Sequence, residues 1–174
     1  NYYPARQLRE DQYQFAWYAY GKDYHDLMKT RLTALQAYIS AHSPLPLQSR
    51  VFCDTAPVLE RYWAYRAGLG WIGKNTQLII PHAGSCFFLG ELFLDMEVDE
   101  YAQPQKNRCG NCTRCIQACP TKALEAPFLL NSRRCLSYLT IENRDAIPLL
   151  EGKKMGNKIY GCDECQKACP WNKF

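Results

Sequence analysis

Cysteine spacing constrains this 174-residue sequence more than any other feature, because eight of its ten cysteines lie from Cys109 onward. The first run reads Cys109-x2-Cys112-x2-Cys115-x3-Cys119-Pro120. This is the bacterial ferredoxin spacing, in which three thiolates bind one [4Fe–4S] cluster and the fourth cysteine turns toward a second cluster. The run therefore predicts two neighbouring clusters.

A second run, Cys162-x2-Cys165-x3-Cys169-Pro170, lacks the first cysteine of the pattern, because Ile159 stands at that position. Cys135 lies between the two runs and is the natural substitute. Crossing of the fourth ligands predicts the two sets. Cluster one takes Cys109, Cys112, Cys115 and Cys169, and cluster two takes Cys119, Cys135, Cys162 and Cys165.

Zinc and disulfide bonds are the alternatives for these cysteines. Structural zinc sites usually combine pairs of C-x2-C, and do not use three cysteines at x2 spacing followed by Cys-Pro. No secretory signal opens the sequence, so an oxidising compartment is not indicated. We therefore predict a one-electron relay. The remaining cysteines, Cys53 and Cys86, are expected to be small buried hydrophobic residues.

The composition is that of a globular protein, with 47% hydrophobic and 22% charged residues. No apolar run is long enough for a membrane span, and a cytoplasmic protein is expected. The net charge of +4 comes entirely from residues 109–174, which hold 10 Lys and Arg against 6 Asp and Glu. This excess indicates either a surface for nucleic acid or compensation for negatively charged clusters.

Two regions, 1–107 and 108–174, are predicted, with the polar stretch 99–107 between them. Helical and strand patterns alternate in the first region, which indicates an α+β or α/β layered domain. A helix is expected over 24–41, with Asp23 as N-cap and an apolar face that includes Leu27, Leu32, Leu35 and Ile39. A second helix is expected over 58–67, with Thr55 as cap. Strands are expected over 50–53, 77–80 and 85–96.

Three segments of the first region carry candidate chemistry. Asp54 follows a strand and precedes a helix start, where α/β folds place reactive groups, although a plain first-turn carboxylate is the simpler interpretation. The glycine-rich segment 68–75 has G-x-G-x-x-G spacing in the wrong context, and it fails as a P-loop at Asn75. Two interpretations of this segment remain: a simple turn, or a backbone that approaches another ligand closely. Residues 23–25 (DYH) begin a cobalamin motif, D-x-H-x-x-G, that fails at Met28.

Taken together, these segments resemble the epoxyqueuosine reductase family, the cobalamin-dependent iron–sulfur enzymes of queuosine tRNA modification. The matching stretches cover nearly the whole chain in order. They are DYH (23–25), CDTAPVLER (53–61), AGLGWIGKN (67–75), GSCFFLGEL (84–92), CGNCTRCIQACPTKAL (109–124), LNSRRCLSYLTIE (130–142) and GNKIYGCDECQKACPWN (156–172). The combination is far more specific than a ferredoxin run alone.

The resemblance implies a nitroreductase-like α/β cobalamin domain in 1–107 and a ferredoxin-like domain with two [4Fe–4S] clusters in 108–174. It places the proton donor at Asp54. The cobalamin pocket would draw on Lys74, Asn75, Thr76, Leu78, Ser85, Leu89 and Ser137. Cobalamin is expected to be base-off, with no histidine of the failed motif replacing its base. Family members begin before Asn1 and many continue past the second cluster, so an incomplete cobalamin domain is expected.

The implied reaction is the two-electron reduction of an epoxide to an alkene, with loss of water. Electrons would pass through the clusters to cobalamin, whose reduced cobalt attacks the epoxide-bearing ring. Asp54 would act as general acid, with a pKa raised by burial.

A tRNA anticodon stem-loop is the implied substrate, with an external low-potential electron donor as second partner, no membrane, and a monomeric enzyme. The cationic candidates for phosphate contacts are Arg133, Arg134, Lys153, Lys154 and Lys158. The aromatic candidates for stacking on bases are Tyr138 and Trp171. Solvated surface residues and core aromatics are the simpler interpretations of each.

Two other functions remain open at this point. A reductive dehalogenase-like corrinoid reductase would act on a small molecule instead of tRNA. A ferredoxin-type electron-transfer module would need neither Asp54 nor the glycine-rich segment. Cobalamin binding separates the module from the enzymes, and competition by tRNA separates the two enzymes.

Overall fold

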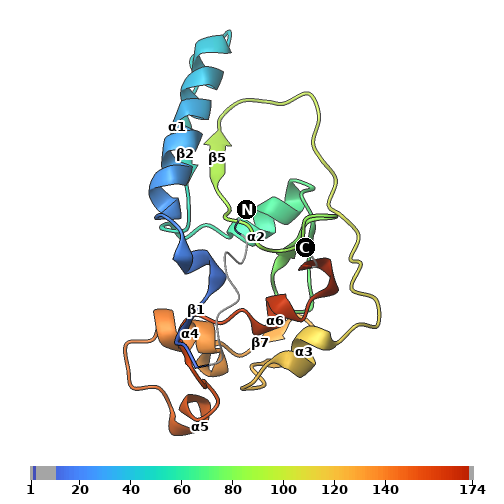
Figure 1. The fold of residues 1–174 in the computed structure, drawn as a ribbon. Coiled ribbons are helices and arrows are strands. Elements are labelled where there is room, and N and C mark those ends of the chain that lie inside the picture. Colours follow the sequence, from blue (N-terminus) through green and yellow to red (C-terminus); the bar gives the residue numbers. More distant parts are fainter. Residues whose placement is uncertain (1, 3–10, 173–174) are drawn as a thin grey trace.

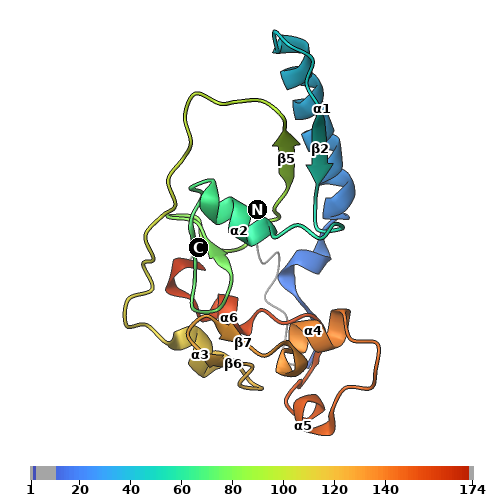
Figure 2. The same cartoon turned by 180° about the vertical axis from the view of Figure 1, so that it is seen from behind.

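The computed structural model describes residue 2 and residues 11–172. Its helices and strands form an α+β arrangement with four small sheets of two strands each. In Figure 1 and, from behind, in Figure 2, α1, β2 and β5 form one end of the molecule, α2 lies in the middle, and α3 to α6 form the other end. The helices are α1 (Tyr24–His42), α2 (Glu60–Arg66), α3 (Arg114–Ala118), α4 (Leu136–Ile141), α5 (Leu149–Gly152) and α6 (Glu164–Lys167).

The sheets pair strands in both orientations. Strands β2 and β5, β3 and β4, and β6 and β7 are antiparallel, whereas β1 and β8 are parallel. The strands are β1 (Gln14–Phe15), β2 (Ser49–Phe52), β3 (Trp71–Ile72), β4 (Leu78–Ile79), β5 (Glu91–Leu94), β6 (Leu124–Ala126), β7 (Leu129–Leu130) and β8 (Lys158–Tyr160). Among the described helices, none combines the length and the apolar character that crossing a bilayer requires.

Helix α1 confirms the predicted helix, and it begins where Asp23 accepts a 2.9 Å hydrogen bond from the His25 backbone N–H. Its predicted apolar face is correct in part: Leu32 and Ile39 are half-buried, whereas Leu27 and Leu35 stay about half exposed. The helix packs Leu32 together with Met28 over Gly90. A methyl group at Gly90 would lie only 2.7 Å from Leu32 Cδ1, so the bare backbone permits this contact.

The predicted strands are shorter than their sequence patterns. Only Glu91–Leu94 of the 85–96 run forms a strand, because its partner β2 offers four residues, from Ser49 opposite Leu94 to Phe52 opposite Glu91. Strand β4 is likewise limited to Leu78–Ile79 by the two residues of β3. The length of each strand therefore follows from its partner.

Helix α2 starts later than predicted, at Glu60, and Thr55 does not cap it. The segment before it is held in tight turns, with 2.6 Å from the Thr55 N–H to the Cys53 carbonyl. Asp54 adopts a left-handed backbone with φ of 58°. These turns keep residues 54–59 outside the helix.

The glycine-rich segment is a turn, and its close backbone approach is to the chain's own strand β4. A Cβ atom at Gly70 would lie 2.1 Å from the Ile79 carbonyl oxygen. The neighbouring Trp71 and Ile79 are the centre of a small core, each 1% exposed. Trp171 packs edge-on against Trp71 with ring centroids 4.8 Å apart, so the C-terminal end returns to this core.

The two predicted regions contact each other at several places. Strand β1, from the first region, pairs with β8 from the second. The backbone N–H of Ser85 donates to Asn172 Oδ1 at 2.6 Å, and the Trp17 N–H donates to Asp163 Oδ2 at 2.7 Å. The division at residue 107 stays a prediction.

Candidate active site

Three neighbouring cavities gather the residues that the sequence singled out. A small cavity of about 30 Å³ is lined by Cys109, Cys112, Cys115 and Cys169. A second, of about 230 Å³, is lined by Cys119, Cys135, Cys162 and Cys165. These are the two sets that the crossing of the cysteine runs predicts. A third cavity, of about 650 Å³, contains Asp54.

The packing of α3 against α6 brings the two cysteine runs together. Cys115 lies in α3 and Cys165 in α6, while Cys135 precedes α4. Within the described residues, no three His, Cys, Asp or Glu side chains converge as ligands of one metal ion. The cysteines instead surround cavities, an arrangement suited to a cluster of several irons.

Burial raises the pKa of four of these thiols, Cys115, Cys162, Cys165 and Cys169, and so disfavours their ionisation without a metal. It raises the pKa of Cys162 to about 11, and the pKa of Cys165 is raised further by burial and then by the neighbouring sulfurs. Cys119 differs: burial raises its pKa, but hydrogen bonds from backbone N–H groups and from the Thr121 hydroxyl together outweigh burial and lower it. One of these donors is the Ala123 N–H, 3.2 Å from the sulfur. Such donors also stabilise the ligated thiolate.

Lys74 links the glycine-rich segment to the first cysteine run. Its ammonium donates to the Gly110 carbonyl at 2.6 Å and to the Cys112 carbonyl at 3.0 Å. The resemblance implied a cobalamin contact for Lys74, but the structure directs its charged end toward the first cysteine cavity. The positive charge lies where a negatively charged cluster would be bound.

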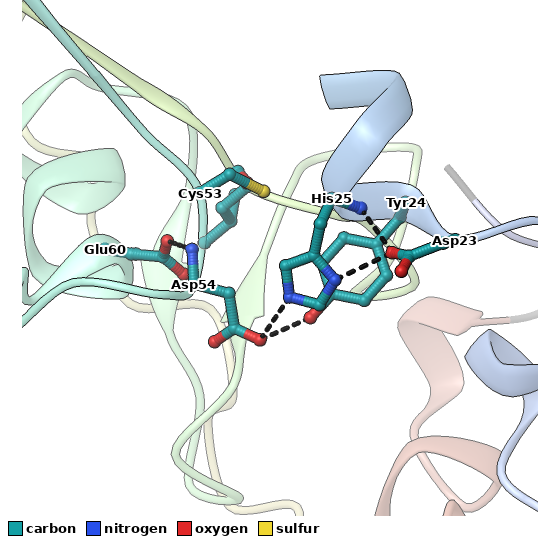
Figure 3. Close-up of polar contacts among 7 residues, drawn as sticks. Asp23, Tyr24, His25, Cys53, Asp54 and Glu60 are labelled. Carbon is teal, nitrogen blue, oxygen red and sulfur yellow. Dashed lines mark hydrogen bonds and ion pairs between the residues drawn. The ribbon is translucent and has the colours of Figure 1, made fainter. Parts of the chain in front are cut away.

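The carboxylate of Asp54 lies against the start of α1 (Figure 3). The Tyr24 hydroxyl donates a hydrogen bond to Asp54 Oδ2, and His25 Nε2 lies 3.4 Å from the same oxygen. His25 Nδ1 is 2.8 Å from Asp23 Oδ1, so the ring bridges the two carboxylates. The sequence failed to identify Tyr24 and His25 as site residues, although both belong to the DYH segment.

The expected burial of Asp54 is wrong, because its side chain is 57% exposed toward the cavity. Polar contacts, not burial, hold this carboxyl. Burial raises the pKa of Tyr24 above its ordinary range, and the hydrogen bond to Asp54 raises it further. Tyr24 therefore keeps its proton and remains a donor. Its ring stacks on Phe88, with centroids 4.1 Å apart and planes within 8°.

Glu60 holds Asp54 from the opposite side (Figure 3), where its Oε1 accepts a hydrogen bond from the Asp54 backbone N–H. Cys53, which directly precedes Asp54, is 1% exposed. Cys86 is also 1% exposed, so the prediction that both cysteines are buried is confirmed. The Cys53 thiol donates to the Leu89 carbonyl at 3.3 Å. No sequence pattern indicated Glu60, since its partner is a backbone group.

The walls of the Asp54 cavity are largely apolar. They include Val58, Leu59, Tyr62, Ile72, Phe87, Phe88, Leu89 and Phe128. Thr76 also lines it, and Thr76 Oγ1 and the neighbouring Asn75 Nδ2 are buried without a hydrogen-bond partner among the described residues. Gln77 lines both this cavity and the second cysteine cavity, so the two adjoin. Unpaired polar atoms at an apolar cavity suit a large ligand with amide groups.

The structure distributes the implied cobalamin contacts among these cavities. Thr76 and Leu89 line the Asp54 cavity, whereas Asn75 and Ser137 line the second cysteine cavity. Leu78 and Ser85 line none of the three. Leu78 is buried in β4, and Ser85 is 7% exposed, outside any strand.

Ser85 has partners within the chain. The Ser85 hydroxyl lies 3.0 Å from Gln166 Oε1 and accepts from Asn172 Nδ2 at 2.9 Å. These bonds use its polar group to connect the two regions.

Two family models match the chain. Residues 108–172 match the 4Fe-4S double cluster binding domain. Residues 1–55 match the model described as epoxyqueuosine reductase QueG, DUF1730. The chain belongs to the epoxyqueuosine reductase family. The match outside residues 108–172 goes beyond what a ferredoxin-type module needs.

Curated epoxyqueuosine reductases support this assignment. The one from Xanthomonas campestris pv. campestris is 55% identical over 159 residues, which are 91% of this chain and 44% of the relative. The one from Cellulophaga algicola is 43% identical over the whole chain and 56% of its own length. The chain thus spans about half the length of the curated relatives it matches.

Solved epoxyqueuosine reductase structures share the fold. A crystal structure with a tRNA-Tyr epoxyqueuosine-modified stem loop matches 98% of this chain and 46% of its own, at a TM-score of 0.89 and 34% identity. A Bacillus subtilis structure, with a catalytic aspartate loop swung out of the active site, matches 99% of this chain and 46% of its own at the same score and identity.

The residues expected to contact tRNA in an epoxyqueuosine reductase differ in their surroundings. Arg134 lies 3.7 Å from Glu151, and Lys158 lies 3.5 Å from Glu164, so both have partners within the chain. Trp171 packs against Trp71 as a core aromatic residue. The exposed candidates are Arg133, Lys153, Lys154 and Tyr138.

Proposed function

We propose that this chain carries the catalytic site for reducing the epoxide of epoxyqueuosine in tRNA to the alkene of queuosine. The conversion consumes two electrons and two protons and releases the epoxide oxygen as water. One observation carries the proposal: the Asp54 cavity adjoins a cavity lined by four cysteines, with Gln77 lining both. An acid and an electron source thereby meet at one site.

The two cysteine sets are proposed to hold two [4Fe–4S] clusters in crossed fashion. The first cavity is lined by three cysteines of the first run and by Cys169 of the second run. The second cavity is lined by Cys162 and Cys165 of the second run, by Cys135, and by Cys119 of the first run. Lys74, with its ammonium on the Cys112 carbonyl, offsets the negative charge of the first cluster. An external low-potential donor would supply electrons one at a time.

Base-off cobalamin is the cofactor that we propose for the Asp54 cavity. Thr76, which lines this cavity, would offer its unpaired hydroxyl to the amide groups of the cofactor, and Leu89 would contact its apolar faces. Bound cobalamin would supply a strongly reducing cobalt centre, which no side chain can replace. The apolar walls would exclude water from that centre.

Asp54 is proposed to donate the proton to the opening epoxide oxygen. Tyr24 orients the carboxyl by donating to its Oδ2. His25, 3.4 Å from that oxygen, is placed to return a proton to Asp54 after each turnover. The relative from Bacillus subtilis has its catalytic aspartate loop swung out, and we infer that the Asp54 loop of this chain has the same freedom.

The substrate is proposed to bind through an anticodon stem-loop. The exposed cations Arg133, Lys153 and Lys154 would contact phosphates, and exposed Tyr138 would stack on a base. A small-molecule corrinoid reductase would not need these contacts. Steep weakening of RNA binding with increasing salt is therefore expected.

Anaerobic reconstitution with iron, sulfide and cobalamin tests the proposal. The expected result is about eight irons and one cobalt per chain. With a chemical reductant, an epoxyqueuosine-containing stem-loop should lose one oxygen by mass spectrometry. Iron without cobalt, or reduction of an organohalide but not of the RNA, would overturn the proposed function.

A further inference from the structure

The loop that carries Asp54 depends on a carboxylate outside it. Asp54 has a left-handed backbone with φ of 58°, a conformation that a residue with a side chain keeps only with support. Its N–H donates to Glu60 Oε1, at the first position of α2. The side chain of Glu60 thus folds back over the turn that leads into its own helix (Figure 3).

The carboxyl of Glu91, in strand β5, lies next to that of Glu60. Glu91 begins β5, opposite Phe52, and its Oε2 is buried without a hydrogen-bond partner in the described part of the chain. Burial raises the pKa of Glu91 to about 7, and the charge of Glu60 and a hydrogen bond with it raise the pKa as well. A carboxyl in this setting keeps a proton to donate to its neighbour.

We propose that Glu60 is a positioning residue that holds the Asp54 loop in the cavity, and that protonated Glu91 holds Glu60 in place. The importance of this loop for catalysis rests on the proposed function, whereas the hold on its backbone does not. The chain of contacts runs from Glu91 in β5 to Glu60 in α2 and then to the Asp54 N–H. It connects the β2–β5 sheet to the acid at the cavity.

Asp54, Cys53 and Lys29 are the other ionisable groups around Glu60 and Glu91. Asp54 itself adds negative charge that raises the pKa of Glu91. Cys53 also faces both glutamates, but burial raises its pKa to about 11, so it stays neutral near pH 7. Lys29 on α1 acts on Cys53 in the opposite direction. Burial and these neighbouring charges together place the pKa of Glu91 at about 7.

Amide hydrogen exchange of a peptide covering 52–59 measures the hold directly, without cofactor or substrate. Glu60→Ala should speed exchange of this peptide about tenfold or more, because it removes a charged hydrogen-bond acceptor. Glu60→Gln keeps an acceptor oxygen and should stay close to wild type. The control is Glu97→Ala, which alters an exposed glutamate elsewhere. If the 52–59 peptide of Glu60→Ala exchanges at the same rate as that of the wild type, the proposal is overturned.

The role of Glu91 is tested by the pH dependence of the same exchange. Loss of its proton as pH rises through about 7 sets two carboxylates against each other and weakens the hold. Wild type should therefore show an acceleration near pH 7 beyond that of an unstructured reference peptide, and Glu91→Gln should not. Identical profiles for wild type and Glu91→Gln would remove Glu91 from the mechanism.

Turnover distinguishes this inference from the proposed function. In the reconstituted protein, Glu60→Ala should lower kcat about tenfold with little change in KM for the stem-loop, and Glu60→Gln should restore it. If wild type is inactive yet Glu60→Ala frees the loop, the proposed function fails and the positioning role stands. If wild type is active and Glu60→Ala matches it in exchange and in kcat, the positioning role fails.

Discussion

The hydroxyl of Tyr24, at the first position of α1, donates a hydrogen bond to the carboxylate of Asp54, which follows β2. One of the two groups opens a long helix and the other sits in a strained turn. Their contact fixes the direction of the carboxyl at the cavity wall.

Tyr24→Phe removes this donor and keeps the ring that stacks on Phe88. We expect kcat to fall about tenfold, because the hydrogen bond that orients the carboxyl is lost while packing is retained. Steady-state reduction of the modified stem-loop measures the effect. Tyr38→Phe, on the exposed side of α1, is the control. An unchanged kcat in Tyr24→Phe would show that the contact does not orient the acid.

Asp54→Asn keeps the size of the side chain but removes its acidic proton. Turnover should fall at least about 100-fold, while iron content and cobalamin binding stay at wild-type levels. Asp26→Asn, at an exposed position in the first turn of α1, is the matched control. Full activity of Asp54→Asn would exclude Asp54 as the proton donor.

Lys74→Met removes a positive charge that lies on the Gly110 and Cys112 carbonyls. Reduction adds negative charge to a cluster, so losing this cation should lower the midpoint potential of the first cluster only. A redox titration followed by electron paramagnetic resonance measures both potentials. Lys29→Met, on α1, is the control. Equal shifts in both clusters would argue against a local effect of Lys74.

Glu91 makes stability depend on pH with a defined sign. Its pKa rises from 4.5 to about 7 on folding, so the folded state binds more protons than the unfolded state between these values. The free energy of unfolding should therefore fall as pH rises through this window and level off above it. Urea unfolding of wild type and Glu91→Gln gives the difference. A difference that is constant with pH would contradict the raised pKa.

The network of Ser85, Gln166 and Asn172 should contribute to stability. Asn172→Ala leaves the buried Ser85 N–H without its acceptor, at a cost of about 1–3 kcal/mol of unfolding free energy, while the Ser85 hydroxyl keeps its bond to Gln166. Denaturant titration measures it, with Asn111→Ala at an exposed position as control. A loss no larger than that of the control would mean that the two regions are joined mainly by other contacts.

Local patterns predicted much of this site. The cysteine spacings indicated two crossed sets, and each set lines one cavity of the structure. The cap at Asp23 and the extent of α1 could also be predicted from the sequence. A helix start is encoded within a few residues, and its length follows from a local periodic pattern. Asp54 stood out through its place after a strand, without any information about its partners.

Contacts between distant segments could not be read in this way. The ends of β4 and β5 depend on the lengths of β3 and β2, which are separate segments of the chain. Ser85 was assigned to a pocket, yet its partner Asn172 lies 87 residues away. No periodic pattern records such a pair, since either residue alone is an ordinary polar side chain.

The sequence by itself determined the redox chemistry, because the ligand spacing of a cluster is written along one short stretch of chain. Tertiary structure decided which groups surround the acid. Packing brings α1, the loop after β2 and α2 to one cavity, so that Tyr24, His25 and Glu60 all contact Asp54. Such convergence depends on how separate elements pack in three dimensions, and the order of residues alone does not encode it visibly.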